Sequence, residues 1–319
     1  MRSTTGASAR RLSILGPIIV IAACAPSAAV VSPTPSPAPG FRIVAPDTRQ
    51  EMTYGQMIER VARADVVFFG EQHDDPETHR AEAAVLESLG RIGRAVVLSL
   101  EMFERDVQPV LDAYLAGRLS EADFLARSRP WPRYATDYRP LVELAKARGW
   151  PVIAANVPRP LASAVGRKGL AALDTLSAAE RLSAARDNVC PNDDYHARFM
   201  EQMQGHGAGA GPAPAPGDTL PTAMAQRFYL AQCVKDETMA ESIVEARRRA
   251  PRNAIVVHFN GAFHSDFAQG TVDRVRRREP RWKLAVVTAV PARDPAAAPV
   301  APQSGRADVV IFTRAAPAG

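Results

Sequence analysis

Two segments far apart in the sequence share a pattern that places a histidine at the end of an apolar run. Residues 66–73 end in Gly-Glu-Gln-His, and residues 255–264 contain Gly-Ala-Phe-His. Runs rich in Val, Ile and Phe are typical of buried strands. In a parallel sheet, the residues just past the carboxyl ends of the strands gather in one crevice, where ligands bind. The sequence therefore predicts that His73 and His264 share a site.

Carboxylates accompany these histidines. Glu71 lies on the same loop as His73, and Glu101 follows an apolar run at residues 95–100. Imidazole and carboxylate groups together suit a divalent metal, for which His73, Glu71 and His264 are the candidate ligands. They also suit general acid–base catalysis, for which Glu71, His73, Glu101 and His264 are the candidate catalytic residues. Glu101 has a third interpretation, as a helix cap.

The sequence gives weaker indications of a functional role for the other histidines. His258 sits inside an apolar run and is expected in the core, whereas His79 is expected on the solvated side of a helix. His196 lies in the predicted helical region and His206 in its loop, and no role is assigned to either.

The pattern of apolar runs and amphipathic segments predicts an α/β fold. We expect a mostly parallel sheet flanked by helices, with a small all-helical subdomain. The α/β core domain is predicted to comprise residues 42–160 and 251–315. Residues 161–250 have helical patterns and no good strand, and they are predicted to form the helical subdomain, with a flexible loop at 205–221 that is rich in Gly, Ala and Pro.

The N-terminal residues resemble an export signal. Residues 1–23 combine arginines with a short apolar run, as in a signal peptide, and Ile21-Ala22-Ala23-Cys24 resembles a bacterial lipobox. Lipidation of Cys24 is expected, followed by a tether at residues 24–41 that is rich in Pro, Ala and Ser. The alternative is an ordinary secretory signal with an incidental cysteine. A lipid anchor places the protein in the bacterial cell envelope, and Ala25 after the cysteine favours the outer membrane, facing the periplasm or the surface.

Two further cysteines, Cys190 and Cys233, suit either a disulfide or two buried thiols.

The chain has a net charge of +5, but aromatic residues do not interleave with its basic runs, so we expect no nucleic-acid partner. The arginines of residues 274–278 are expected at a solvated helix end. The sequence contains no Gly-x-Ser-x-Gly elbow, P-loop or dinucleotide fingerprint, which disfavours a serine esterase or a nucleotide enzyme.

Six short motifs together resemble the ChaN family of haem-binding lipoproteins, over about residues 44–290. These motifs are Gly70-Glu71-Gln72-His73 with Asp74-Asp75-Pro76, Leu100-Glu101-Met102-Phe103, Tyr138-Arg139-Pro140-Leu141, Asn156-Val157-Pro158-Arg159, Asp236-Glu237-Thr238-Met239-Ala240 and Gly261-Ala262-Phe263-His264. The wider superfamily includes the Tiki metalloproteases, the TraB-like proteins and the erythromycin esterases.

The resemblance implies haem binding, at a dimer interface and with a tyrosine as iron ligand, and a role in iron acquisition. Tyr138 and Tyr195 are the first candidate ligands, followed by Tyr134 and Tyr229, since tyrosinate is a hard donor that suits ferric haem. Arg139 and Arg159 are candidates to pair with the haem propionates or with Glu101, and His264 is a further haem-binding candidate. The superfamily also implies the alternative, a hydrolase that uses the Glu and His crevice with or without a metal.

Overall fold

The structure is a computed structural model that describes residues 41–205 and 222–315. The predicted signal peptide, Cys24 and nearly all of the predicted tether and flexible loop lie outside the described residues.

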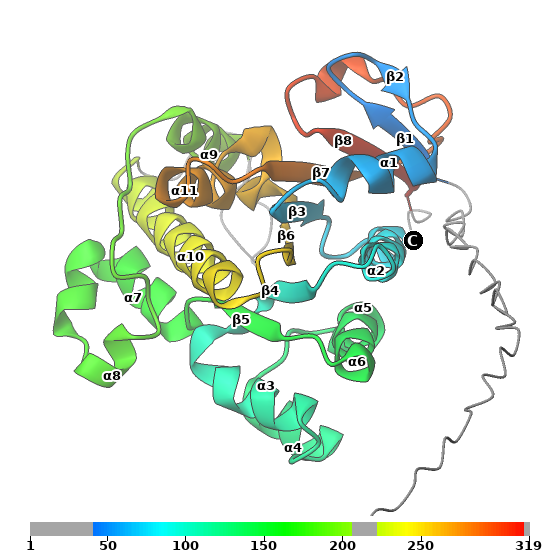
Figure 1. Cartoon of the computed structure of the whole chain (residues 1–319). Coiled ribbons are helices and arrows are strands. Elements are labelled where there is room, and N and C mark those ends of the chain that lie inside the picture. Colours follow the sequence, from blue (N-terminus) through cyan, green and yellow to red (C-terminus); the bar gives the residue numbers. More distant parts are fainter. Residues whose placement is uncertain (1–40, 206–221, 316–319) are drawn as a thin grey trace, which may run out of the picture. The chain divides into compact units, whose positions relative to one another are not determined.

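An eight-stranded sheet forms the centre of the fold (Figure 1). Its order is β2-β1-β8-β7-β3-β6-β4-β5, and every pairing from β8 to β5 is parallel. Only β1 pairs in the antiparallel direction, with β2 on one side and β8 on the other. The strands are β1 (Arg42–Ala45), β2 (Gln50–Glu51), β3 (Val66–Glu71), β4 (Val96–Glu104), β5 (Val152–Asn156), β6 (Ile255–Gly261), β7 (Leu284–Ala292) and β8 (Val309–Arg314). The predicted α/β fold with a mostly parallel sheet is confirmed, whereas the β1–β2 hairpin was not predicted.

Helices cover both faces of the sheet, because successive strand residues point to opposite sides. On β3, Val67 and Phe69 join the core beneath α1 to α6, whereas Val66 and Phe68 join the core beneath α10 and α11. The helices are α1 (Tyr54–Val61), α2 (Pro76–Leu89), α3 (Gln108–Leu115), α4 (Glu121–Ser128), α5 (Tyr134–Asp137), α6 (Arg139–Arg148), α7 (Arg159–Lys168), α8 (Ala178–Arg181), α9 (Asp194–Gly205), α10 (Thr222–Arg249) and α11 (Thr271–Arg278). None of these helices has the length and apolar composition needed to cross a bilayer.

The described part of residues 161–250 contains helices and no strand, as expected. A small apolar cluster joins α7 to α10 through Val165 and Val234. The other side of α10 packs on the sheet, through Ile243 and Val244. Helix α10 therefore packs both on the helices of residues 161–250 and on the sheet. The predicted boundaries of the helical subdomain stay a prediction.

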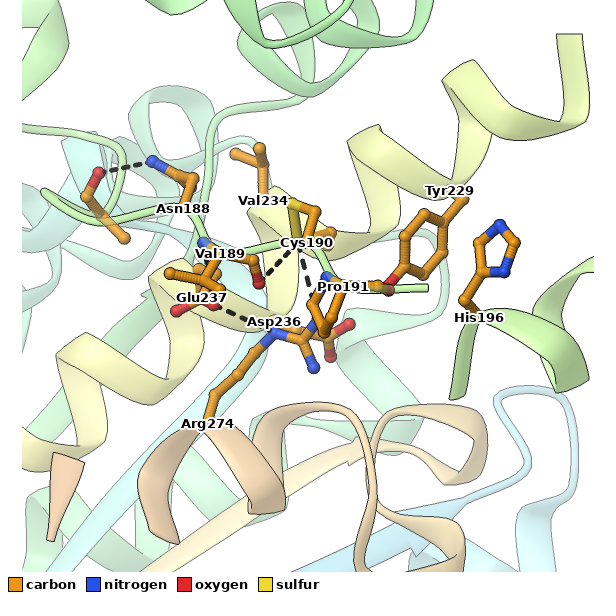
Figure 2. The surroundings of a disulfide bond; sticks show 12 residues. Asn188, Val189, Cys190, Pro191, His196, Tyr229, Val234, Asp236, Glu237 and Arg274 are labelled. Carbon is orange, nitrogen blue, oxygen red and sulfur yellow. Dashed lines mark hydrogen bonds and ion pairs between the residues drawn. A yellow bond between two sulfur atoms is a disulfide. The ribbon is translucent and has the colours of Figure 1, made fainter. Parts of the chain in front are cut away.

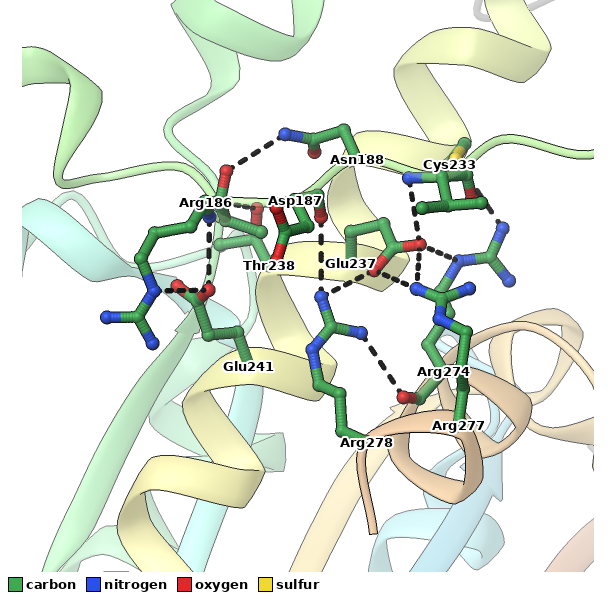
Figure 3. A network of polar contacts seen from close by, with 12 residues as sticks. Arg186, Asp187, Asn188, Cys233, Glu237, Thr238, Glu241, Arg274, Arg277 and Arg278 are labelled. Carbon is green, nitrogen blue, oxygen red and sulfur yellow. Dashed lines mark hydrogen bonds and ion pairs between the residues drawn. The ribbon is translucent and has the colours of Figure 1, made fainter. Parts of the chain in front are cut away.

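A buried carboxylate fixes α11 to α10 (Figure 3). Glu237 is fully buried in the middle of α10, where arginines from α11 surround it. Arg277 and Arg278 each lie 2.6 Å from its carboxylate oxygens, and Arg274 lies at 3.4 Å. Residues 274–278 do end α11, and Arg276 and Arg277 are exposed as expected, but the expectation of a solvated helix end is wrong for Arg274 and Arg278. Arg274 itself is only 2 % exposed, because a buried carboxylate needs opposite charges close by.

A disulfide joins Cys190 to Cys233 and ties the segment before α9 to α10 (Figure 2). The two cysteines are 43 residues apart in the sequence, so the bond closes a long loop. Cross-linking such a loop limits the unfolded chain more than the folded one. Tyr229, one turn before Cys233 on α10, donates a hydrogen bond to the carbonyl of Pro191, which supports the same junction.

We expect the double variant Cys190→Ser/Cys233→Ser to lose about 2–4 kcal/mol of unfolding free energy, the usual effect of removing a bond that closes a loop of this length. Urea unfolding followed by circular dichroism measures the loss. Dithiothreitol should destabilise the wild type by a similar amount and leave the double variant unchanged. Equal stability of the two proteins in oxidising buffer would contradict this account.

Candidate functional site

The register of three parallel strands brings the predicted site residues to one edge of the sheet. Strand β6 lies between β3 and β4, and Phe259 pairs with Phe69 on one side and with Leu100 on the other. Strands β3 and β6 therefore end side by side, at the pair of Glu71 and Gly261, and β4 runs on past them to Glu104. Glu101 follows Leu100 in β4, and Gly261 donates its backbone N–H to the Glu101 Oε2 atom at 2.8 Å.

His73 and Glu71 form the first pair of the site. Nδ1 of His73 contacts Glu71 Oε1, and the Tyr138 hydroxyl donates to the same oxygen at 2.9 Å. The Glu71 side chain is fully buried, whereas 47 % of the His73 side chain is exposed. Burial acts to lower the pKa of His73, but the bond to Glu71 and the charge of Glu101 outweigh it, so this pKa is raised. His73 is therefore an oriented imidazole that a ligand can reach.

His264 is held between two buried carboxylates. Its Nε2 atom lies 3.2 Å from Glu101 Oε1, and its Nδ1 atom lies 2.7 Å from Asp236 Oδ1. Asp236 also accepts hydrogen bonds from the Tyr195 hydroxyl at 2.7 Å and from Thr271 at 2.8 Å. Both ring nitrogens of His264 are thus engaged by groups of the protein itself.

The two carboxylates decide the charge of His264. Burial acts to lower its pKa, but the charges of Glu101 and Asp236 outweigh burial and raise the pKa to about 9. Likewise, burial acts to raise the pKa of Glu101, but the charge of His264 and its hydrogen bond lower it. His264 is a cation at neutral pH, so it is not suited to act as a base, and it supplies a fixed positive charge beneath the cavity.

His79 is buried, so the expectation of a solvated histidine is wrong. It lies on the inner face of α2, where Nδ1 is 2.9 Å from Glu82 Oε2 and 3.6 Å from Glu71 Oε2. Among the described residues, Glu71, His79 and Glu82 place one ligand atom each within 4.8 Å of one another, as a metal site requires. The predicted trio of His73, Glu71 and His264 does not form such a group in the part of the chain that the structure describes.

A cavity of about 890 Å³ opens above this edge of the sheet. His73, Glu101 and His264 form part of its floor. Its walls combine apolar and cationic side chains from α9, α10 and the segments after β6 and before β8, together with Trp131. These wall residues are Trp131, Phe199, Met203, Phe263, Phe267, Arg198, Lys235 and Arg306. Arg198 lies over the Phe263 ring, with its guanidinium carbon 4.1 Å from the ring centroid.

The structure does not bring every predicted residue to the cavity. Tyr138 and Tyr195 lie beneath it with their hydroxyls on Glu71 and Asp236. Arg139 forms an exposed ion pair with Glu121 instead of meeting Glu101, because α6 begins on the outer side of the fold. Arg159 lies at the start of α7 beside a separate, smaller cavity.

Several residues of the site were not predicted from the sequence. Asp236 orients His264 from the middle of α10, and Gln232 lies one turn earlier, 3.3 Å from His264 Nε2. Trp131 packs its ring edge-on against His73, at 5.1 Å between centroids. The sequence did carry a signal for Asp236, which belongs to one of the six motifs of the resemblance and lies in a run of polar residues at 235–238, because buried polar side chains need partners.

We expect the unfolding free energy to fall as the pH rises from about 6.5 through about 9. The folded pKa of His264 is raised, so the stability it contributes is complete below the ordinary value of 6.5 and is lost as the pH passes about 9. In His264→Gln this slope should flatten, and stability at pH 6.5 should drop by about 3–5 kcal/mol, since two buried carboxylates lose their partner. Urea titrations at three pH values measure both effects.

The control is His196→Gln, which changes a histidine that is bonded to Gln226 away from the carboxylates. This variant should keep the wild-type slope. An unchanged slope in His264→Gln would show that another group carries the pH dependence.

Comparison with solved structures finds three similarities of different strength. A structure described as cofacial haem binding to ChaN of Campylobacter jejuni matches with a TM-score of 0.62 and 14 % identity, over 86 % of this chain and 98 % of that chain. A mutant of the erythromycin esterase EreC in its open conformation matches with a TM-score of 0.46 and 11 % identity, over 88 % and 98 %. RRSP, a toxin effector domain from Vibrio vulnificus, matches with a TM-score of 0.38 and 17 % identity, over 74 % and 35 %. No curated protein matches the sequence.

The family assignment comes from the sequence itself. A family model described as haem-binding uptake, Tiki superfamily, ChaN matches residues 57–275, which is more than half of the 319 residues. This match contains all the motifs on which the resemblance to ChaN was based, and it confirms that prediction. The chain belongs to the ChaN family of haem-binding uptake proteins in the Tiki superfamily.

Proposed function

We propose that this protein binds haem in the cavity above the sheet, as a lipid-anchored component of haem or iron uptake in the bacterial cell envelope. The observation that carries the proposal is the family match over residues 57–275. The predicted signal peptide and Cys24 support the anchor. A homodimer, which the resemblance to the ChaN family implies, is part of the same proposal.

The residues of the cavity fit haem. Haem presents a flat apolar macrocycle and two propionates, so its site needs apolar walls and nearby cations. Phe199, Phe263 and Phe267 supply apolar surface, and Lys235 and Arg198 supply positive charge. Lys235 has no ion-pair partner among the described residues. When bound, haem would supply an iron centre with axial positions for a protein donor.

We expect a hemin titration of the full chain in detergent to give saturable binding with a shifted Soret band. Lys235→Gln should weaken binding about 10- to 100-fold, since one charge-assisted hydrogen bond contributes roughly 1.5–3 kcal/mol. The matched control is Arg127→Gln, which removes an exposed cation of α4 that does not line the cavity. Absence of saturable binding by the wild type, measured against a micelle blank, would refute the proposal.

A second candidate function is hydrolysis, and the His73–Glu71 pair favours it. A carboxylate that orients an exposed imidazole is the arrangement of a general base, and the cationic His264 lies on the same cavity floor. If the protein hydrolyses an ester or a peptide, we expect His73→Gln to reduce the rate about 10²–10⁴-fold without loss of folding. A substrate screen with the wild type tests this, and turnover that survives the substitution would exclude the pair as the catalytic base.

A further inference from the structure

We propose that Glu71, His79 and Glu82 bind one divalent transition-metal ion, such as Zn²⁺ or Mn²⁺, between the end of β3 and helix α2. This site differs from the trio of His73, Glu71 and His264 that the sequence predicted, and it does not depend on the proposed haem function. The supporting evidence is the arrangement of the ligand atoms, the carboxylate oxygens that lack a donor, the orientation of His79 and the balance of charge.

The ligand atoms have the separations that one metal ion requires. Glu71, His79 and Glu82 are all buried and place one ligand atom each within 4.8 Å of one another. Nδ1 of His79 lies 2.9 Å from Glu82 Oε2 and 3.6 Å from Glu71 Oε2. Nitrogen and oxygen ligands lie about 2.0–2.2 Å from Zn²⁺, so neighbouring ligands are roughly 2.8–3.6 Å apart in octahedral or tetrahedral geometry. The observed separations fall within this range.

Two buried carboxylate oxygens beside His79 lack a hydrogen-bond donor. Glu71 Oε1 accepts from the Tyr138 hydroxyl and contacts His73, but Glu71 Oε2 receives no hydrogen bond from any described residue. The same is true of Glu82 Oε1. Both glutamate side chains are 0 % exposed. Buried polar atoms without a partner are rare and costly, and a cation bound between the two carboxylates would engage them.

The imidazole of His79 has the orientation of a metal ligand. Its Nε2 atom lies 3.2 Å from the backbone carbonyl oxygen of His73 and 3.4 Å from Asp137 Oδ2. Since both neighbours only accept, Nε2 carries the hydrogen, and in the neutral ring Nδ1 presents its lone pair to the carboxylates. Histidines that bind metals commonly donate their other ring N–H to a carbonyl or a carboxylate in this way. Tyr138 packs edge-on against the ring, at 5.1 Å between centroids, and limits its rotation.

The balance of charge also calls for a divalent cation. Within the described residues, Glu71 and Glu82 form ion pairs with histidines only, and with no lysine or arginine. A protonated His79 would supply one positive charge, and its Nδ1–H would point to one carboxylate, whereas two buried carboxylates lie beside it. A divalent ion supplies both charges. Asp137 has a partner of its own, because Arg133 lies 2.8 Å from its carboxylate.

The donor set selects the class of metal. One imidazole nitrogen with two carboxylates suits Zn²⁺, Mn²⁺ or Fe²⁺, whereas Ca²⁺ and Mg²⁺ prefer oxygen donors alone and Cu⁺ prefers sulfur. Glu71 ends β3, and His79 and Glu82 lie three residues apart on one face of α2. The ion would therefore connect β3 to α2 and hold the Glu71 carboxylate that orients His73.

The test begins with the full-length wild type in detergent, made without a polyhistidine tag, stripped by a chelator and titrated with Zn²⁺ in the absence of hemin. Mass spectrometry of the bound metal should give about one ion per chain. Saturating Zn²⁺ should raise the melting temperature by roughly 5 °C or more, since the ion binds the folded state only. Co²⁺ should give a visible absorption spectrum that Zn²⁺ abolishes.

Two substitutions remove single ligands. Glu82→Gln and His79→Gln should weaken Zn²⁺ binding at least about 100-fold and abolish the Co²⁺ spectrum, because a lost ligand costs more than a lost supporting residue. The matched controls are Glu87→Gln, which changes a glutamate of α2 that is 44 % exposed, and His196→Gln, which changes a histidine bonded to Gln226. Both controls should keep the wild-type affinity and spectrum.

Stability without metal separates a metal site from an ion pair. In metal-free buffer, Glu82→Gln should be at least as stable as the wild type, because it removes one of two neighbouring buried carboxylates and keeps the side-chain volume. A purely structural pair between Glu82 and a protonated His79 predicts a lower stability of this variant in the same buffer, and that result would overturn the proposal. Glu82→Gln alone decides the test if His79→Gln does not fold.

Two other results would overturn the metal site. One is a wild type that binds Zn²⁺, Mn²⁺ and Fe²⁺ no more tightly than Glu82→Gln does. The other is binding that His79→Gln keeps and His264→Gln loses, which would place the ion in the cavity instead. None of these results bears on haem, because the hemin titration is a separate measurement, so the two proposals succeed or fail independently.

Discussion

Compensation of buried negative charge is the constraint on which this structure depends. Glu71, Glu101, Asp236 and Glu237 are each at most 3 % exposed. An isolated carboxylate is far too costly in such surroundings, so every one must have cations or hydrogen-bond donors at short range. His264 serves two of them, and the arginines of α11 serve a third. The positions of α10, α11 and the loop after β6 are therefore fixed by charge as well as by apolar packing.

The same compensation of buried charge gives His264 and His73 different roles in the site. Charge on Glu101 and Asp236 keeps His264 protonated and fully engaged. On the other side, Glu71 has a phenol and an imidazole as partners, and the imidazole stays half exposed. One histidine thus contributes a fixed positive charge, whereas the other keeps a nitrogen that faces the cavity. Two similar sequence patterns give different chemistry because their carboxylate neighbours differ in number.

The sequence predicted the parallel sheet and its crevice because continuous apolar runs identify buried strands, and parallel strands align their carboxyl ends. It could not predict β2, which has two residues, both exposed. His79 was misassigned because the helical pattern of α2 does not show that Glu71 lies across from it. The role of Asp236 depends on contact with His264, 28 residues away, and no local pattern encodes such a contact.

The bond between Cys190 and Cys233 links the folded state to the cellular compartment in which the chain matures. Thiols remain reduced in the cytosol and are oxidised after export. A chain retained in the cytosol would lack the covalent connection between α10 and the segment before α9. α9 and α10 both contribute wall residues to the cavity, so the proposed export would place the formation of this bond, beside the cavity wall, after translocation. Recombinant protein made in a reducing compartment would accordingly lack the bond between Cys190 and Cys233, whereas protein made in an oxidising compartment would contain it.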